Sequence, residues 1–428
     1  MELKLDLTNI GCTIKLYRNQ QGITQEELSL GICTPSYLSR IENSNIVANL
    51  EIYELLFQKL NLDFSAKKQE YEIVNAILES FYTDLLLNNK FNESSLEVLK
   101  GQNPLFFERN LNLKRELVLC KYLITLRKYD DAKKQLNAIS KTIKTANSRN
   151  NFLYSNIAIL LFYLTNEYQK AFDMIERMEK NDRFFKDGSK FEIACFHFNA
   201  ALVAIKLYKY QKCIDSCSLA LAYFKILYKP SLDFKCHMML GIAKNRICQF
   251  TLAEEHYFIC NNILENIEEV RSLENFNLLY SNLGYCKECQ GDFKQAIVYY
   301  LKAIDYQEDV EIYINLLICH FKIGNFNESI KYLKIIRNWG DTDSKIQHQV
   351  EIFSILLTED HSMKLSELAQ LEKSAFKFFE VKKLYVLGGY YARILANYYK
   401  DLYMYKESSD YFEKELLFNE LKRKRREN

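Results

Sequence analysis

Apolar residues recur at helical spacing along most of the chain, and one short pattern returns from about residue 70 onward. In this pattern an aromatic residue is followed by two polar residues and a small one, and apolar residues come four and seven positions after the small one. The copies begin at Phe91, Tyr129, Tyr168, Tyr210, Phe250, Phe293, Phe326 and Tyr405, and the weakest copy begins at Leu365, with leucine in place of the aromatic residue and Glu372 at an apolar position. Twelve residues before most of the small positions lies a second small residue, for example Gly241 or Gly284. The spacing predicts about nine antiparallel helix pairs, whose helices cross where small residues let the backbones approach.

The first sixty or so residues have a different pattern, which predicts five short helices. Gly22 is typical of a helix end, and Thr24 with Glu27 three residues later forms a capping box for the next helix. Gly31 then provides a turn. Thr34 is placed to cap a third helix, because proline follows it at the first helical position. Two short helices joined by a glycine-containing turn indicate a helix-turn-helix unit.

Composition supports an all-α fold. Only 3 residues are proline and 12 are glycine, too few for the turns of a β-sandwich, whereas 48% are hydrophobic, enough for a large core. The charge is nearly balanced, with 57 basic and 55 acidic residues. No apolar run reaches the length of a membrane span, and the N-terminus lacks the layout of a signal peptide. Twelve cysteines, mostly on apolar helix faces, indicate reduced thiols, so we expect a cytoplasmic protein without a membrane partner.

Catalytic chemistry is not indicated by any motif. The pair Cys286 and Cys289 has no second pair and no histidine at ligand spacing, so we interpret it as helix packing. The chain has no phosphate-cradling glycine loop and no nucleophile elbow. We therefore expect no enzyme activity, no catalytic residues, no metal and no cofactor. The basic run 422–426 is interpreted as a solvated helix end, with an auxiliary phosphate contact as the alternative.

Residues 17–43, with their caps, turn and core positions in order, closely resemble the Cro/repressor (xenobiotic-response-element) family of DNA-binding domains, over about 55 residues in all. The resemblance implies that Gln25 holds a DNA phosphate and that Tyr37 and Asn43 contact the DNA backbone. It also implies that three residues face base edges in the major groove, namely Thr34, Ser36 and Arg40. Arg40 is the strongest candidate for base recognition, because its guanidinium can pair with guanine through two hydrogen bonds. The alternative is a surface arginine paired with a carboxylate.

Residues 9–66 carry four basic and six acidic side chains, an unfavourable balance for binding DNA. Phosphate neutralisation supplies much of the affinity of such domains, so a monomer should bind weakly. We therefore expect a homodimer or a higher homo-oligomer, formed through the rest of the chain.

The repeated pattern is that of tetratricopeptide repeats, which stack into a right-handed solenoid with an extended binding groove. Asparagine recurs fourteen residues before the small position of the second helix, at Asn199, Asn282 and Asn315. This position faces the groove, and an asparagine side chain can both donate to and accept from an extended peptide backbone. On the first helix of the last pair, Asn397, Arg393 and Tyr390 share that face. The alternative is that these side chains bond neighbouring helices or water.

A Cro-like domain at residues 1–66 followed by tetratricopeptide-like repeats at 67–428 resembles the RNPP family of peptide-pheromone receptors. The resemblance implies a cytoplasmic quorum-sensing regulator that binds double-stranded operator DNA and is switched by a short signalling oligopeptide. Two alternatives stay open. The repeats could act on a response regulator, as in Rap-like and NprR-like proteins, or they could only dimerise a peptide-independent repressor.

Overall fold

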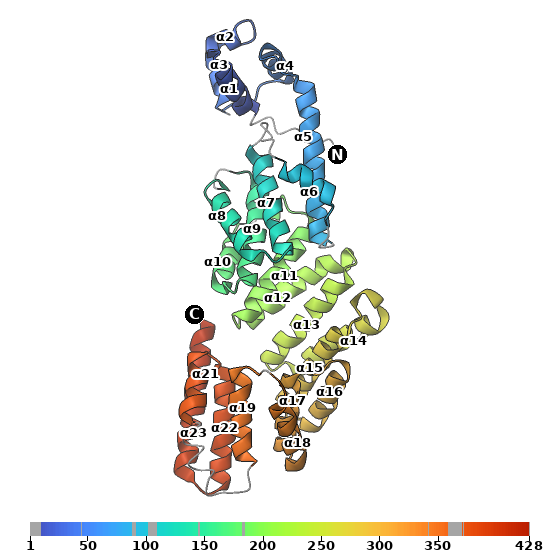
Figure 1. The fold of residues 1–428 in the computed structure, drawn as a ribbon, viewed down its shortest axis with the longest axis vertical. Helices are drawn as coiled ribbons and strands as arrows, with labels where there is room; N and C mark the ends of the chain where they lie inside the picture. Colours follow the sequence, from blue (N-terminus) through green and yellow to red (C-terminus); the bar gives the residue numbers. More distant parts are fainter. Residues whose placement is uncertain are drawn as a thin grey trace. The chain divides into compact units, whose positions relative to one another are not determined.

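The computed structural model describes residues 10–43, 45–87, 91–101, 109–143, 146–181, 185–340, 342–357, 370 and 372–427. All regular elements in these residues are helical, and the all-α fold with an N-terminal helix-turn-helix and repeat-type helix pairs is confirmed (Figure 1). The chain divides into two compact units, Met1–Ser189 and Lys190–Asn428. In the part of the chain that the structure describes, none of the helices combines the length and apolarity that a bilayer crossing requires.

The first unit begins with four short helices, α1 (Ile10–Gln20), α2 (Gln25–Ser29), α3 (Pro35–Glu42) and α4 (Leu50–Lys59). The expected capping box is present: the Thr24 hydroxyl accepts from the Glu27 N–H at 3.1 Å, and the Glu27 carboxylate accepts from the Thr24 N–H at 2.7 Å. Helices α1 and α3 cross at Gly11, where a Cβ atom would lie 1.7 Å from the Ile41 carbonyl oxygen. This crossing therefore requires glycine.

The expected fifth short helix is instead a 24-residue helix, α5 (Phe64–Leu87), which continues through residue 66. Phe64 packs in the core of the first four helices, whereas Leu78 and Leu85 belong to the core of the following pairs. Those pairs are α5 with α6 (Glu93–Lys100), α7 (Arg109–Thr125) with α8 (Tyr129–Ser140), and α9 (Ser148–Leu164) with α10 (Tyr168–Glu179).

The second unit continues with the same kind of helix pair. Its elements are α11 (Lys190–Lys206), α12 (Tyr210–Ile226), α13 (Pro230–Arg246), α14 (Phe250–Asn266), the 3₁₀ turn η4 (Glu268–Val270), α15 (Leu273–Gln290), α16 (Phe293–Tyr306), α17 (Val310–Lys322), α18 (Phe326–Arg337), α19 (Ser344–Leu356), the π-helical turn η5 (Glu372–Phe376), α21 (Lys377–Val381), α22 (Tyr385–Asp401) and α23 (Tyr405–Glu427). The pattern copy that begins at Leu365 starts outside the described residues.

The repeating aromatic residue is the first residue of the second helix in seven pairs, at Tyr129, Tyr168, Tyr210, Phe250, Phe293, Phe326 and Tyr405. Two positions earlier the chain takes a positive φ, at Arg127, Asn166, Tyr208, Cys248, Gly291, Gly324 and Tyr403. Only two of these seven are glycine, so the other five turns accept backbone strain of about 1 kcal/mol or more each. This explains how many tight turns coexist with a low glycine content.

Small residues set the distance between the helices of a pair, as the sequence pattern predicts. A Cβ atom added at Gly241 would lie 2.5 Å from the Tyr257 ring, and one at Gly284 would lie 2.6 Å from the Tyr300 ring. Both rings are fully buried. The large aromatic side chain of one helix thus occupies the space that the glycine of its partner leaves empty.

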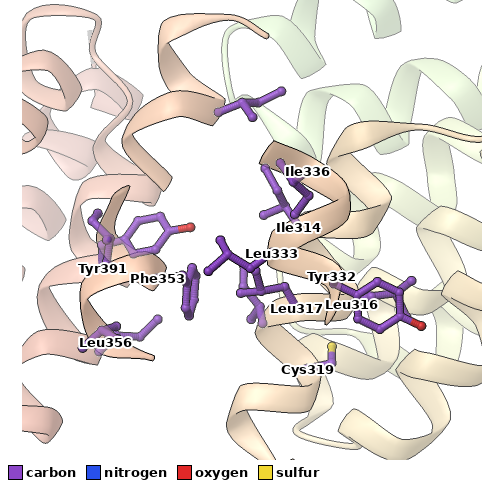
Figure 2. Packing of buried hydrophobic residues seen from close by; sticks show 14 of the residues in the cluster. Ile314, Leu316, Leu317, Cys319, Tyr332, Leu333, Ile336, Phe353, Leu356 and Tyr391 are labelled. Atoms are coloured by element: carbon purple, nitrogen blue, oxygen red, sulfur yellow. The ribbon is translucent and has the colours of Figure 1, made fainter. Parts of the chain in front are cut away.

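The core of the second unit is continuous from α16 to α23. Figure 2 shows part of it, where Phe353 of α19 lies between Leu333 of α18 and Tyr391 of α22. The Phe353 and Tyr391 rings meet edge to face at 5.9 Å between centroids, and the Tyr391 hydroxyl donates to Gln349 at 2.8 Å. The hydroxyl of Tyr391, its one polar side-chain group, therefore has a hydrogen-bond partner within the core.

Substitution of Gly284 by alanine should lower the free energy of unfolding by about 1–3 kcal/mol, because the new methyl group must displace the Tyr300 ring. That ring cannot move cheaply, since it is buried and its hydroxyl bonds to Glu288. Urea unfolding of the full chain measures the effect. Gly340→Ala is the matched control, because nothing lies within 4 Å of a Cβ atom there. Equal stability of the two variants would contradict the packing account.

Acid should destabilise the second unit through two histidines. His237 of α13 and His256 of α14 place their Nδ1 atoms 3.0 Å apart, and burial lowers the pKa of each to about 4. Free histidine has a pKa of about 6.5, so below that pH the unfolded chain takes up protons that the folded chain does not. Stability is therefore complete above pH 6.5 and should fall as the pH drops toward 4.

Thermal melts between pH 7.5 and 4.5 test this expectation. His256→Gln removes one of the two rings and should reduce the loss of melting temperature over this range relative to the unmodified chain. An identical pH dependence in the two proteins would show that the histidine pair does not contribute.

Candidate functional site

Helix α3 presents a short polar face that is held by its first turn. The Thr34 hydroxyl accepts from the Tyr37 N–H at 3.2 Å, and Pro35 occupies the first helical position. Leu38 and Ile41 are buried beneath the helix. The opposite face is open: Ser36 and Arg40 are exposed. The helix is therefore anchored along one side and free to meet a ligand along the other.

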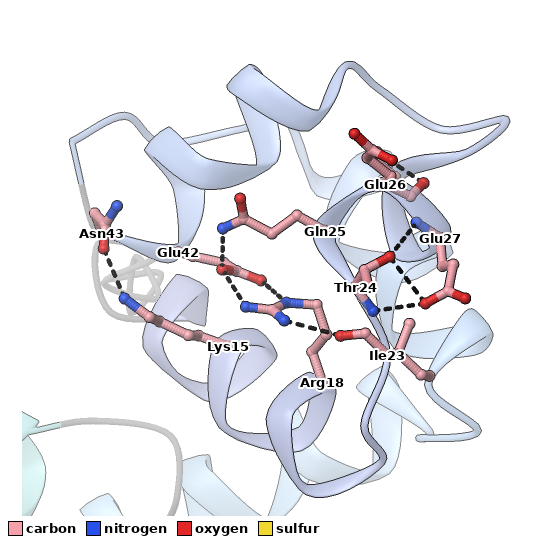
Figure 3. Close-up of polar contacts among 10 residues, drawn as sticks. Lys15, Arg18, Ile23, Thr24, Gln25, Glu26, Glu27, Glu42 and Asn43 are labelled. Atoms are coloured by element: carbon pink, nitrogen blue, oxygen red, sulfur yellow. Dashed lines mark hydrogen bonds and ion pairs between the residues drawn. The ribbon is translucent and has the colours of Figure 1, made fainter.

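A buried ion pair fixes α3 against α1 and α2 (Figure 3). The Arg18 guanidinium of α1 donates to both carboxylate oxygens of Glu42, from Nε at 2.6 Å and from Nη2 at 2.9 Å, and its Nη1 donates to the Ile23 carbonyl at 2.8 Å. Gln25 Nε2, at the start of α2, donates to the same carboxylate at 2.6 Å. The hydrogen bond to Glu42 raises the pKa of Arg18. One carboxylate thus holds three helices in register.

The six residues expected to contact DNA lie on α2, on α3 or at the ends of α3. The Gln25 amide uses one N–H on Glu42 and carries a second one, as any primary amide does. Asn43, which follows α3, accepts from Lys15 Nζ at 2.9 Å and is exposed. Tyr37 is half-buried and Thr34 exposed. Sequence analysis did not identify the Arg18–Glu42 pair, although both residues lie within the string that resembles the Cro/repressor family.

The second unit contains a cavity of about 400 Å³. It is lined by side chains from α13, α15, α17, α19, α22, α23 and the residues next to them: Tyr208, Arg246, Tyr285, Glu311, Ile314, Asn315, Lys345, Gln349, Lys383, Leu384, Tyr385, Val386, Leu387 and Lys422. The volume lies in the range of pockets that hold small ligands. The lining combines four basic side chains and one carboxylate with three tyrosines and a band of aliphatic residues.

Arg246 and Tyr285 form the best-defined polar contact in the cavity. Arg246 Nη1 donates to the Tyr285 hydroxyl at 2.6 Å, and the guanidinium carbon lies 4.6 Å from the centre of the Tyr285 ring. Lys345 Nζ, also in the lining, lies 2.8 Å from the Glu311 carboxylate. Glu311 is therefore paired with a cation of the same lining.

A second polar group lies near Arg246 and Tyr285. The Tyr300 hydroxyl donates to Glu288 at 2.8 Å. Burial raises the pKa of Glu288 to about 7, although the hydrogen bond from Tyr300 and the charge of Lys322 oppose this shift. The Tyr390 hydroxyl is buried and, within the described residues, lacks a hydrogen-bond partner. Lys322 Nζ lies 5.7 Å from the centre of the Tyr390 ring.

Of the six residues predicted to bind a peptide, Asn315 is in the described lining of the cavity. The Asn282 amide instead donates to the Leu278 carbonyl of its own helix at 2.8 Å, and Arg393 forms an ion pair with Glu415 at 3.0 Å. Asn199 is half-buried on α11, and Asn397 is exposed on α22.

Most of the cavity lining was not found from the sequence. Arg246 lies five residues after Gly241, as Cys289 lies five residues after Gly284, so the repeat spacing contained a signal for it. Residues 383–387 lie in the turn before α22 and in the first residues of α22, and Lys422 lies near the end of α23. The repeated positions of the pattern do not include any of them. The described residues contain no group of three side chains that could hold a metal ion.

Both the N-terminal part and the repeats of the chain are similar to known proteins. Residues 14–66 match the helix-turn-helix family. The transcriptional activator NprA of Geobacillus stearothermophilus is 23% identical over 89% of this chain and 96% of its own length. The chain therefore has the helix-turn-helix domain of DNA-binding transcription regulators.

Solved structures extend the likeness to the repeats. The apo quorum sensor NprR from Bacillus thuringiensis is 19% identical, with a TM-score of 0.65 over 82% of this chain and 99% of its own. Apo RapI matches with the same TM-score and coverage at 16% identity. NprR with its cognate peptide NprX matches with a TM-score of 0.54 at 18% identity, over 79% of this chain and 97% of its own.

Together, the helix-turn-helix domain and the repeat fold define a regulator with an attached tetratricopeptide-type helical domain. In these two parts the chain is similar to the transcriptional activator NprA and, in fold, to the quorum sensor NprR.

Arg40→Ala should abolish the preference of the protein for its operator over random DNA, at a cost of about 1–3 kcal/mol per half-site, while its melting temperature stays unchanged. The reason is that Arg40 is exposed and contributes nothing to the core. Competition binding with labelled operator measures the preference. Arg18→Ala is the contrast, since it leaves Glu42 buried without its partner and should lower the melting temperature. Retained operator preference in Arg40→Ala would contradict the assignment.

Proposed function

We propose that the protein is a cytoplasmic transcription regulator that binds operator DNA through α3 and is switched by a short signalling peptide bound in the cavity of the second unit. The observation that carries the proposal is this cavity: a space of about 400 Å³ lined by an asparagine, tyrosines and basic side chains, in a chain that also exposes a helix-turn-helix.

The open face of α3 supports DNA recognition. Its exposed side chains, Ser36 and Arg40, have the length and donor groups that reach base edges in the major groove. The domain carries more acidic than basic residues, so one copy gains little from phosphate contacts. A homodimer doubles these contacts and matches the two half-sites of an operator. We therefore propose that the functional species is at least a dimer.

The lining of the cavity supports a peptide as its ligand. NprR, whose repeats have a similar fold, has been solved with its cognate peptide NprX. Asn315 offers a donor and an acceptor to a peptide backbone, and the aliphatic residues from 384 to 387 offer an apolar surface to its side chains. An extended peptide of five to eight residues is about 17–28 Å long, so it would continue past the cavity over neighbouring helices.

A second candidate function follows from the likeness to RapI, which equals that to NprR in TM-score and coverage. In this alternative the repeats act on a response regulator. A phosphotransfer assay with response regulators of the same organism separates the two functions, because only the alternative predicts a change in their phosphorylation. A peptide-independent repressor, the third possibility, predicts no peptide effect in any assay.

Asn315→Ala should weaken peptide binding by about 5- to 150-fold, because it leaves a peptide donor or acceptor unpaired at a cost of about 1–3 kcal/mol. The loss should be similar for peptides of different sequence, since the contact is to the backbone. Calorimetric titration of the full chain with peptides encoded beside the gene measures it. Asn338→Ala, at the exposed end of α18, is the matched control and should bind normally.

Asn282→Ala tests the rest of the predicted asparagine set. Its amide already bonds within α15, so a bound peptide must compete for it and the loss should be smaller than for Asn315→Ala. Unchanged peptide affinity in both variants would remove the asparagines from the site. Operator binding that no peptide alters would overturn the proposed switch.

A further inference from the structure

We propose that Glu288, Lys322 and Tyr390 form a latch that closes when Glu288 loses its proton. In the closed latch, the Lys322 ammonium and the Tyr390 hydroxyl both bind the Glu288 carboxylate. The three residues lie on α15, α17 and α22 of the second unit, so closure holds these helices together. The latch goes beyond the proposed function, because it requires neither a peptide nor DNA.

The first argument is that three complementary polar groups lie close together without bonding to one another. Among the described residues, the Glu288 carboxyl group bonds only to the Tyr300 hydroxyl. The Lys322 side chain forms no ion pair and no hydrogen bond with them, and its ammonium lies 5.7 Å from the centre of the Tyr390 ring. The Tyr390 hydroxyl is buried and has no partner in the same part of the chain. Each group therefore gains free energy from a contact with another.

The second argument comes from the preceding helix pair, in which the same position is neutral. Glu288 lies four residues after Gly284, the glycine of its helix crossing. In the preceding pair, the residue four positions after Gly241 is Asn245. Both glycines lie against a buried tyrosine ring of the partner helix. The crossing thus accepts an amide at this position, so its packing does not require the carboxyl group of Glu288.

The third argument is that Glu288 exchanges its proton near neutral pH. Burial raises its pKa to about 7, against the hydrogen bond from Tyr300 and the charge of Lys322. Protonated Glu288 offers Lys322 no charge, whereas the ionised carboxylate attracts it strongly in a partly enclosed place. The closed latch therefore binds fewer protons than the open one, and closure should become favourable as the pH rises through about 7.

Other titratable or charged groups lie near Glu288 and Lys322. They are Arg246 of α13, Tyr285 and Cys289 of α15, Tyr300 of α16, Cys319 of α17, Tyr391 of α22, and the ion pairs Lys287–Glu254 and Arg393–Glu415. Burial raises the pKa of each of these tyrosines and cysteines, so they stay neutral near pH 7. Arginine keeps its charge throughout. A charge change near pH 7 in this group of residues therefore belongs to Glu288.

Hydrogen–deuterium exchange of the full-length protein, followed by mass spectrometry at about pH 6 and about pH 8, tests the latch. After correction for the effect of pH on unprotected amides, the rates give the protection of α22. The unmodified protein is compared with Glu288→Gln, with Lys322→Met and with the double variant. Melting curves at about pH 6 check that each variant folds, and Lys322→Gln replaces Lys322→Met if that variant does not.

In the unmodified protein, α22 should be about 3- to 30-fold better protected at the higher pH, because closure joins it to α15 and α17. Each single substitution should remove most of this gain, and the double variant should lose no more than either single one. Tyr390→Phe should lose part of the gain and change nothing at the lower pH. Lys302→Met is the matched control and should keep the gain, because exposed Lys302 also lies over a tyrosine ring, 5.6 Å from the centre of Tyr280.

Three results would overturn the latch. The first is a full gain of protection in Glu288→Gln. The second is additive loss in the double variant, since Lys322 would then act on a group other than Glu288. The third is equal protection of the unmodified protein at the two pH values, which would indicate a contact that does not depend on the proton. None of these results affects the proposed peptide site, which the titrations with Asn315→Ala test separately.

Discussion

The close crossing of paired helices is the constraint on which the repeat part of the molecule depends. At Gly241, Gly284 and Gly388 a Cβ atom would lie 2.5–2.7 Å from an aromatic ring of the partner helix, so helix separation is set by the absence of a single carbon. The same crossing also positions a polar contact. With its ring held against Gly284, Tyr300 donates its hydroxyl to Glu288 at 2.8 Å.

The helix-turn-helix also depends on a close helix crossing, together with one shared carboxylate. Gly11 brings α1 within backbone contact of α3, and the Glu42 carboxylate joins α1, α2 and α3 through Arg18 and Gln25. In these contacts Glu42, on the inner face of α3, is hydrogen-bonded within the domain. The outer face, with Ser36 and Arg40, remains exposed. Stability and the proposed DNA recognition therefore use different residues of one eight-residue helix, so the two can be measured separately.

Helix caps and helix starts were predictable from the sequence, and contacts between residues far apart in the chain were not. The caps at Thr24 and Thr34 and the first residues of the second helices follow from neighbours in the sequence, so these were found. The Arg18–Glu42 pair joins residues that no short-range rule connects. The cavity also uses residues 383–387, from the turn before α22 and the first residues of α22, and Lys422, near the end of the last helix. None of these residues is at a position that the pattern repeats.

The proposed switch requires coupling between the proposed peptide site and the proposed DNA site. If a bound peptide changes the affinity of the protein for DNA, then DNA must change the affinity for the peptide by the same factor. The most direct test is calorimetric titration of the cognate peptide into the free protein and into the protein saturated with operator. The account predicts two different dissociation constants, whose ratio equals the ratio of operator affinities with and without peptide. Identical constants in the two titrations would contradict it.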